Sequence, residues 1–371
     1  MKILLISDQF PPAIDGVGDY TFHLAREWVA SGCTVIVVCR EAEHKTTGKC
    51  PVRVFSVVQR WNAAGYRRVS TVMDAEQPDF ILLQYVPHGF QAKGLPVLLP
   101  FFFRKWCGQT NSGVFFHEVR VRWEWRSPKT WLVAVVEHLL SRMLHQSANL
   151  RMTSIPAYAD ILPADTHIIP IGANILPVFT EQGQQEALRR RFVPEYAAPV
   201  IIAFGNRDHR PLYVAFRQLQ SKFPKACLLV CGKTMHPITG DGIVHIGIQP
   251  PETLGVVLGF GDVLVLPDSS VGGTSNKSGS LAAALASGCA VVGIRGNMNG
   301  PLLQHGVNIW LADRPDPPCL LEALEKLLKD QTLRARLASE AKRTFEKHLT
   351  WSTIAGKQLE LIRKVTQRSI H

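Results

Sequence analysis

A loop rich in glycine and serine, with one lysine, has the residue types that bind phosphate. It lies in residues 264–294, LVLPDSSVGGTSNKSGSLAAALASGCAVVGI, a pattern typical of buried strand, loop, small-residue helix and second buried strand. Amide N–H groups at a helix start point outward and carry partial positive charge. We expect the amides of Ser278, Gly279 and Ser280, with the ammonium of Lys277, to bind a phosphorylated ligand. The alternative is a surface loop that only joins a strand to a packed helix.

Two arginines follow another apolar strand, in the segment VIIAFGNRDHR. Arg207 and Arg210 stand where that strand ends, and doubly wound sheets bind ligands at the carboxyl ends of their strands. A guanidinium also suits bidentate contact with phosphate. We expect both arginines to contact phosphate, and the alternative for each is a solvated surface side chain.

The loop after the first strand, PPAIDGVGDYTFHLA, holds Gly16 and Gly18. Without a Cβ, these positions let a phosphate or a sugar approach the backbone closely. The third glycine of the dinucleotide fingerprint is missing, so the loop does not favour NAD binding. A plain turn is the alternative.

One histidine, His117 in GVFFHEVR, stands at the carboxyl end of an apolar strand. There an imidazole could hydrogen-bond a sugar hydroxyl or stabilise a developing charge. A histidine with a purely structural role is the alternative.

The elements that must position these residues repeat twice. Continuous apolar strands alternate with helices, which predicts parallel, doubly wound sheets buried on both faces. At 371 residues the chain suits two such domains. We expect two Rossmann-like domains facing across a cleft, one of residues 1–175 completed by a C-terminal helix at 352–371, and one of residues 176–351.

Composition narrows the class of protein. A net charge of +11 invites nucleic acid or an anionic membrane, but no helix-turn-helix, RRM or zinc-finger pattern accompanies it, so we expect no nucleic-acid partner. The eight cysteines are scattered without a CxxC pair or zinc spacing, which favours reduced thiols and no metal site. No apolar run approaches the roughly 20 residues of a spanning helix. The start, MKILLISDQF, is typical of a first strand, and we expect a cytoplasmic protein.

A segment between residues 101 and 131 mixes basic and aromatic side chains. Its members are Arg104, Lys105, Trp106, Arg120, Arg122, Trp123, Trp125, Arg126, Lys129 and Trp131. Such a mixture suits a lipid headgroup surface and predicts peripheral contact at the inner face of an anionic membrane. The alternative is that the aromatic rings pack a helical subdomain and the charges are solvated.

Taken together, the segments resemble the retaining glycosyltransferases of the GT-B fold, specifically glycosyltransferase family 4. The resemblance rests on five pieces in the family's order, which are the N-terminal glycine loop, VFFHE, HIIPIGAN, the stretch from GFGDVLVLPDSS to SLAAALASGCAVVGIRG, and TWSTIAGKQLELIRKV. It implies an acceptor-side first domain and a second domain that binds a nucleotide sugar.

The resemblance also implies an activity and a set of roles. The protein would move a hexose from a nucleotide sugar to a glycan or lipid-linked acceptor in polysaccharide biosynthesis, with retention, without metal and without a cofactor beyond the donor substrate. His117 would be the active-site histidine. Arg207 is similar to the family's diphosphate arginine, and Arg210 stands nearest its lysine.

One departure supports a different class of function. The family's two glutamates, eight positions apart, correspond here to Ser275 and Ala283, which carry no charge. The alternative is therefore a degenerate, non-catalytic member that acts as a binding or scaffold protein. A third possibility is another nucleotide-sugar enzyme of similar fold, such as an epimerase.

Overall fold

The chain folds into two compact units in the computed structural model, which describes residues 1–13, 15–41, 52–119, 128–178, 181–234, 236–269 and 271–368. Unit 1 comprises Met1–Pro170 and Trp351–His371, and unit 2 comprises Ile171–Thr350. The sequence-based division at 175/176 placed residues 171–175 in the first domain, whereas the structure places them in unit 2. The C-terminal helix belongs to unit 1.

Unit 1 is built on a sheet of seven strands in the order β3-β2-β1-β4-β5-β6-β7. All neighbouring strands are parallel. The strands are β1 (Lys2–Ile6), β2 (Thr34–Arg40), β3 (Arg53–Val58), β4 (Phe80–Tyr85), β5 (Asn111–Phe116), β6 (Leu150–Thr153) and β7 (His167–Ile168). The central strand β1 is buried throughout from Ile3 to Ile6, as expected of a strand covered on both faces.

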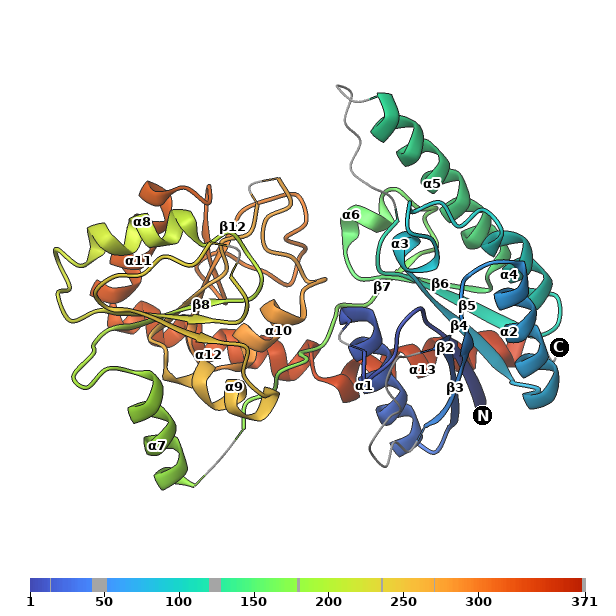
Figure 1. Ribbon diagram of the computed structural model, residues 1–371, viewed down its shortest axis with the longest axis horizontal. Helices are drawn as coiled ribbons and strands as arrows, with labels where there is room; N and C mark the ends of the chain where they lie inside the picture. Colours follow the sequence, from blue (N-terminus) through green and yellow to red (C-terminus); the bar gives the residue numbers. More distant parts are fainter. Residues whose placement is uncertain are drawn as a thin grey trace. The chain divides into compact units, whose positions relative to one another are not determined.

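Helices cover both faces of this sheet (Figure 1). They are α1 (Gly16–Ala30), α2 (Ala63–Glu76), α3 (Pro87–Phe90), α4 (Leu99–Cys107), α5 (Pro128–Ser147), α6 (Pro156–Ala159) and α13 (Trp351–Arg368). Helices α1 and α13 pack together, while α4 packs against α2 and α5. The buried indole N–H of Trp28 donates to the carbonyl of Ala355, 3.1 Å away, and joins α1 to the end of the chain.

Unit 2 has a sheet of six parallel strands in the order β10-β9-β8-β11-β12-β13. The strands are β8 (Val200–Phe204), β9 (Cys227–Cys231), β10 (Ile243–Gly247), β11 (Val263–Val265), β12 (Ala290–Ile294) and β13 (Trp310–Ala312). The helices are α7 (Gln182–Phe192), α8 (Arg210–Leu219), α9 (Pro251–Val257), α10 (Gly279–Ala286), α11 (Pro317–Lys329) and α12 (Gln331–His348).

Strand β8 shows how unit 2 buries both faces of its sheet. Val200, Ile202 and Phe204 pack into a core with the apolar side chains of α9, α10 and α12. Ile201 and Ala203, which point the opposite way, pack with α8 and α11. The prediction of two parallel, doubly wound α/β sheets is confirmed.

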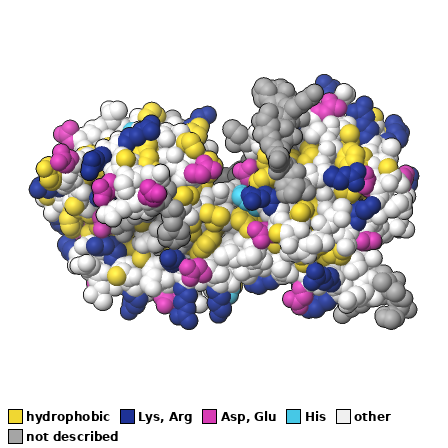
Figure 2. All heavy atoms as spheres, turned by 90° about the horizontal axis from the view of Figure 1, so that it is seen from below, with side chains coloured by type: hydrophobic (Ala, Val, Ile, Leu, Met, Phe, Trp, Pro, Cys, Tyr) yellow, Lys and Arg dark blue, Asp and Glu magenta, His cyan; other side chains and the backbone are white. Residues whose placement is uncertain are grey.

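Charge is spread over the surface seen in Figure 2, where Lys and Arg side chains of both units are interspersed with Asp and Glu. On that face the net charge of +11 is not gathered into one patch. Across the parts of the chain that the structure describes, no helix is both long and apolar enough to cross a membrane.

Candidate functional site

Each sheet has one place where the strand order reverses. In unit 1 the chain proceeds outward from β1 in one direction and from β4 in the other, and in unit 2 β8 and β11 are the corresponding pair. In doubly wound sheets ligands bind outside the carboxyl ends of the strands at this switch point, because the following loops diverge there. Gly16 and Gly18 follow β1, and Arg207 and Ser278 follow β8 and β11, so these candidates lie at the two switch points, whereas His117 follows β5.

In unit 2, Arg207 is the centre of a polar cluster at the switch point. Its Nε donates to Asp268 Oδ1 at 2.7 Å, and its Nη2 donates to Ser278 Oγ at 3.2 Å. A third bond runs from Nη1 to the carbonyl of Phe204, 3.1 Å away, at the end of β8. The side chain of Arg207 is 11% exposed, and these three hydrogen bonds hold its guanidinium in one orientation.

Asp268, which follows β11, fixes the other side of the cluster. Its Oδ2 accepts a hydrogen bond from Thr274 Oγ1 at 2.9 Å, and the same hydroxyl accepts from the amide of Ile294 at 2.9 Å. The carboxylate therefore ties Arg207 to the loop that precedes α10. Sequence reasoning missed Asp268, although an acidic residue directly after the apolar run VLVLP was a visible signal.

Helix α10 starts beside this arginine. Ser278 is its N-cap and accepts a hydrogen bond from the amide of Leu281 at 3.4 Å. The first amides of a helix have no intrahelical acceptor, so those of Gly279 and Ser280 remain donors at the helix start. Gly205, with φ of +90°, is required where it is, because a Cβ there would collide with Arg207 Nη1 and lie 3.2 Å from Ser280 Oγ.

The structure brings Arg207, Ser278 and Ser280 together but directs Arg210 elsewhere. Arg210, at the first residue of α8, pairs with Asp208 at 2.7 Å and has a side chain 59% exposed. Its hydrogen bonds hold the pKa of Asp208 down at about 2. Lys277 is exposed, and its amide donates to Ser275 Oγ at 3.3 Å.

The two positions that correspond to the family's glutamates are enclosed. Ser275 is 5% exposed in the loop, and Ala283 is 2% exposed in α10. The segment HIIPIGAN, residues 167–174, contacts the same loop. The amide of Ile171 donates to the carbonyl of Asn276 at 3.1 Å. A Cβ on Gly279 would lie 3.4 Å from the side chain of Asn174.

Unit 1 holds a pocket of about 370 Å³ at its own switch point. The residues that line it follow β1, end β4, or belong to the start of α1 and to α3. They are Ser7, Asp8, Gln9, Ala13, Asp15, Val17, Gln84, Val86, His88, Gly89 and Phe90. Among the residues that the structure describes, the lining contains two carboxylates and neither lysine nor arginine.

The start of α1 is capped by a carboxylate. Asp15 Oδ2 accepts from the amide of Val17 at 3.0 Å and from that of Gly18 at 2.7 Å. Gly18 is needed for packing, since a Cβ there would lie 3.2 Å from the carbonyl oxygen of Gln9, whereas a Cβ on Gly16 would meet no described atom within 4 Å. The expected phosphate contact at these glycines would have to compete with the carboxylate of Asp15.

Asp8 is the second carboxylate of the pocket. Its Oδ1 accepts from the indole N–H of Trp61 at 2.6 Å, and its Oδ2 lies 3.2 Å from Arg40 Nη2. Burial raises the pKa of Asp8, although the hydrogen bond from Trp61 and the charge of Arg40 oppose the shift.

His117 follows β5 and is 8% exposed. Its Nε2 lies 2.7 Å from Gln84 Oε1, and its ring packs edge-on against Tyr20 with centroids 4.8 Å apart. Burial lowers the pKa of His117 to about 3, so the ring is neutral at pH 7. His117 is not among the lining residues of the pocket, but its partner Gln84 is. Gln84 was missed, although it is the one polar residue of the strand FILLQY.

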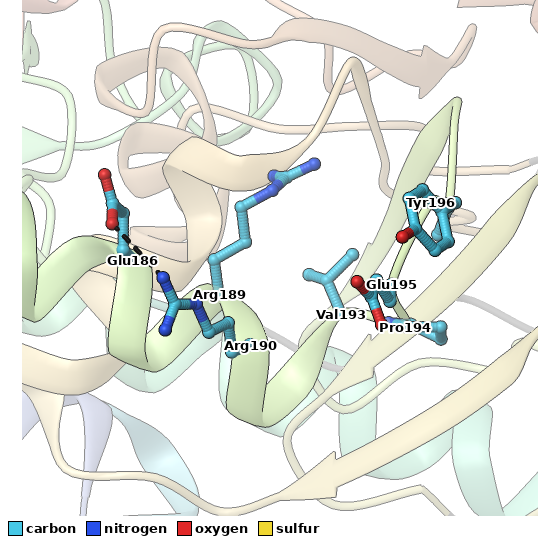
Figure 3. A pocket seen from close by; sticks show the side chains of 8 residues that line it. Glu186, Arg189, Arg190, Val193, Pro194, Glu195 and Tyr196 are labelled. Atoms are coloured by element: carbon cyan, nitrogen blue, oxygen red, sulfur yellow. Dashed lines mark ion pairs between the residues drawn. The ribbon is translucent and has the colours of Figure 1, made fainter.

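A further pocket of about 730 Å³ lies in unit 2, between α7 and the chain that follows it. Figure 3 shows Arg189 and Arg190 pointing apart, with Arg190 turned toward Glu186, whose carboxylate is 3.5 Å away. The Arg189 guanidinium stacks over Phe260. None of the predicted site residues lines this pocket. Within the described ranges, no three His, Cys, Asp or Glu side chains gather as a metal site requires.

The family of unit 1 follows from its sequence. A family model described as a glycosyl transferase 4-like domain matches residues 15–161, a range that holds Asp15, Gln84 and His117. This part of the chain is similar to that family. The resemblance to glycosyltransferase family 4 that the sequence predicted is thereby confirmed for residues 15–161, here called the glycosyl transferase 4-like domain. A comparison with curated proteins gave no match.

Solved structures share the fold of the whole chain. Sucrose-phosphate synthase from Thermosynechococcus elongatus is 16% identical with a TM-score of 0.74, covering 99% of this chain and 100% of that one. HepE from Anabaena in complex with UDP and glucose is 16% identical with a TM-score of 0.69, covering 98% and 100%. WaaG, a glycosyltransferase involved in lipopolysaccharide biosynthesis, is 15% identical with a TM-score of 0.65, covering 97% and 99%. Units 1 and 2 each have the parallel α/β fold found in the two domains of GT-B structures.

Proposed function

We propose that the protein transfers a sugar from a nucleoside diphosphate sugar to a glycan or lipid-linked acceptor. The observation that carries the proposal is Arg207, held at the switch point of unit 2 beside the start of α10. Its support is the glycosyl transferase 4-like domain at residues 15–161 and the likeness to HepE, which was solved with UDP and glucose.

Unit 2 supplies the groups that would hold the donor. The guanidinium of Arg207 and the amides of Gly279 and Ser280 can contact the diphosphate, and the exposed Lys277 adds a formal charge. Negative charge grows on the diphosphate as the bond to the sugar breaks. Donors fixed before the reaction stabilise that charge without reorganising, which is a large contribution in many enzymes.

We propose retention, and transfer that does not depend on a metal ion. A guanidinium and a helix N-terminus can carry the charge that a divalent cation carries elsewhere. In a retaining transfer the acceptor hydroxyl approaches on the face of the leaving group, and a phosphate oxygen takes its proton. His117, being neutral, serves as a hydrogen-bonding group that positions a sugar and not as a charge.

Nucleotide binding tests the donor half of the proposal. The purified chain is heated with UDP, GDP, ADP and their sugar conjugates, without metal and with magnesium, and the melting temperature is recorded. A ligand that binds only the folded state raises this temperature. We expect one nucleotide to do so, and the rise to disappear in Arg207→Ala but not in Arg210→Ala, whose guanidinium pairs with Asp208.

A non-catalytic binding protein is the second candidate, favoured by the uncharged Ser275 and Ala283. Release of nucleoside diphosphate from the bound donor separates the two. Transfer predicts release that depends on an added acceptor, whereas a binding protein shows the thermal shift without release. An epimerase would change the donor sugar without any acceptor.

We also propose peripheral contact of unit 1 with an anionic membrane, through α4. Phe101 is 63% exposed, and Arg104 and Lys105 lie on the same exposed side of this helix, while Leu98 just before it is 42% exposed. Trp106 takes no part, because it is fully buried and donates to Ser70. Residues 120–127, with Arg120, Arg122, Trp123, Trp125 and Arg126, lie outside the described residues.

Sedimentation with vesicles tests this contact. We expect the parent to sediment with vesicles rich in phosphatidylglycerol and to remain in solution with phosphatidylcholine alone. Phe101→Ser with Arg104→Ser should abolish sedimentation. No sedimentation of the parent would reject the contact.

A further inference from the structure

The wall of the unit 1 pocket contains two buried polar atoms that lack a partner. Ser7 Oγ and Gln84 Nε2 make no hydrogen bond within the described structure, although Ser7 is fully buried and Gln84 is 1% exposed. Both residues line the pocket. An unpaired buried polar group costs free energy, so native structures leave few of them without a reason. A ligand oxygen in the pocket would give both groups a partner.

The charge of the pocket selects among possible ligands. Asp8 and Asp15 line it, and Asp19 lies close enough to Asp15 for their charges to interact. Arg40 offsets one of these charges through its contact with Asp8. Among the described residues the lining remains acidic, so these carboxylates would repel a phosphate or carboxylate and would accept hydrogen bonds from hydroxyl groups.

One wall of the pocket is apolar. Phe90 is 2% exposed and packs against Trp61 with ring centroids 4.7 Å apart, and Val17 and Val86 also line the pocket. A sugar ring presents hydroxyl groups at its edge and C–H groups on its faces, which matches a lining with both kinds of surface.

We propose that this pocket binds an uncharged, hydroxyl-rich sugar ring of the acceptor, and that Ser7 and Gln84 are residues that determine its specificity. The role as acceptor rests on the proposed function, but binding of the sugar does not require transfer. Gln84 donates through Nε2 to the ring while its Oε1 keeps the bond to His117. Asp8 and Asp15 accept from the hydroxyl groups.

Binding of free sugars by the full chain tests the proposal. The probes are methyl glycosides of glucose, galactose and mannose, with glucuronate and glucose 6-phosphate as charged counterparts, followed by ligand-observed NMR. We expect at least one methyl glycoside to bind. The corresponding anionic sugar should bind about tenfold more weakly, because the described lining has two carboxylates and no lysine or arginine.

A matched pair of substitutions locates the binding. Ser7→Ala removes the unpaired hydroxyl from the pocket, and Ser154→Ala removes an equally buried, unpaired hydroxyl that is not part of its lining. We expect Ser7→Ala to weaken glycoside binding about tenfold, the loss for one hydrogen bond, and Ser154→Ala to leave it unchanged. Gln84→Met should weaken it further. The two serine variants should melt at similar temperatures.

Three outcomes would overturn the proposal. They are no binding of any uncharged glycoside, binding of the anionic sugars as tight as that of the glycosides, and equal effects of the two serine substitutions. The nucleotide-binding experiment shows whether a negative result concerns only the sugar pocket of unit 1 or also the proposed function. A chain that binds UDP but no glycoside contradicts only the present inference, and a chain that binds glycosides but never releases nucleotide contradicts only the transfer.

Discussion

The switch points of the two units have the same topology and opposite chemistry. In unit 1 the loop after β1 brings Asp8, and α1 is capped by Asp15. In unit 2 the loop after β8 brings Arg207, and α10 is capped by Ser278. Both helix starts have amide N–H groups with partial positive charge. The carboxylate of Asp15 offsets this charge at α1, whereas the uncharged hydroxyl of Ser278 leaves it in place at α10.

The comparison shows how little of a ligand preference comes from the fold. Two parallel sheets place loops and helix starts in equivalent positions, and side chains in those loops decide whether a hydroxyl or a phosphate is favoured. The carboxylate of Asp268 does not make the site of unit 2 resemble that of unit 1, because both of its oxygens already accept hydrogen bonds, from Arg207 and Thr274. It orients the guanidinium and remains partly exposed.

Removing the guanidinium of Arg207 should have the largest effect on ligand binding at the switch point of unit 2. Arg207→Ala should weaken binding of the preferred nucleoside diphosphate about a hundredfold, since two charge-assisted hydrogen bonds are lost. Calorimetric titration measures the affinity. Arg210→Ala is the control, because that guanidinium pairs with Asp208 at the surface. A similar loss in both variants would place the diphosphate elsewhere.

His117 adds no positive charge near the switch point of unit 1 at neutral pH, in contrast to Arg207 in unit 2. The pKa of His117 is lowered by burial to about 3 from 6.5, so the unfolded state binds its proton first as pH falls. The resulting stability is fully present above pH 6.5 and decreases below it, by about 2 kcal/mol at pH 5.

Urea unfolding at pH 8 and pH 5 measures this loss, and His117→Gln should remove it. His23, whose pKa burial lowers to about 4, acts in the same direction and stays in both proteins. A His117 ring that titrates near neutral pH in an NMR experiment would contradict the prediction.

Giving α10 the cap of α1 should convert one site toward the other. Ser278→Asp keeps a good N-cap but puts a carboxylate beside Arg207, whose Nη2 donates to Ser278 Oγ at 3.2 Å in the parent. We expect nucleoside diphosphate binding to weaken about tenfold through repulsion, without loss of thermal stability. Ser278→Asn, an uncharged cap of the same size, should bind as the parent does. Equal binding by both variants would show that the phosphate lies away from this helix.

The two glycines of the α1 loop should differ by a smaller amount. Gly18→Ala should destabilise the fold by about 1 kcal/mol, since its Cβ would press on the carbonyl of Gln9 at 3.2 Å. Gly16→Ala should change stability by less than about 0.5 kcal/mol, because no described atom lies within 4 Å of its Cβ. Thermal unfolding of the two variants checks the difference. A large loss in Gly16→Ala would mean that this position is needed for packing.

The apolar strand pattern was enough to predict the architecture. Runs such as ILLI and VIIAF are continuous because these strands are buried on both faces, and such runs separated by helices predict parallel sheets. Sequence order also placed Arg207 and the start of α10 at strand ends. The polar residues Asp8 and Gln84 were missed because each stands alone at the end of an apolar strand without a motif, and Asp268 was missed although it directly follows the apolar run VLVLP.

The sequence by itself determined the strands, the helices and the family resemblance of residues 15–161, since hydrophobic periodicity and motif order are local properties of the chain. Only the tertiary structure decided which polar groups meet. Arg207 and Asp268 are 61 residues apart in the chain, and His117 and Gln84 are 33 apart. Strand order brings each pair together, and that order is set by packing both faces of a sheet, which no single segment encodes.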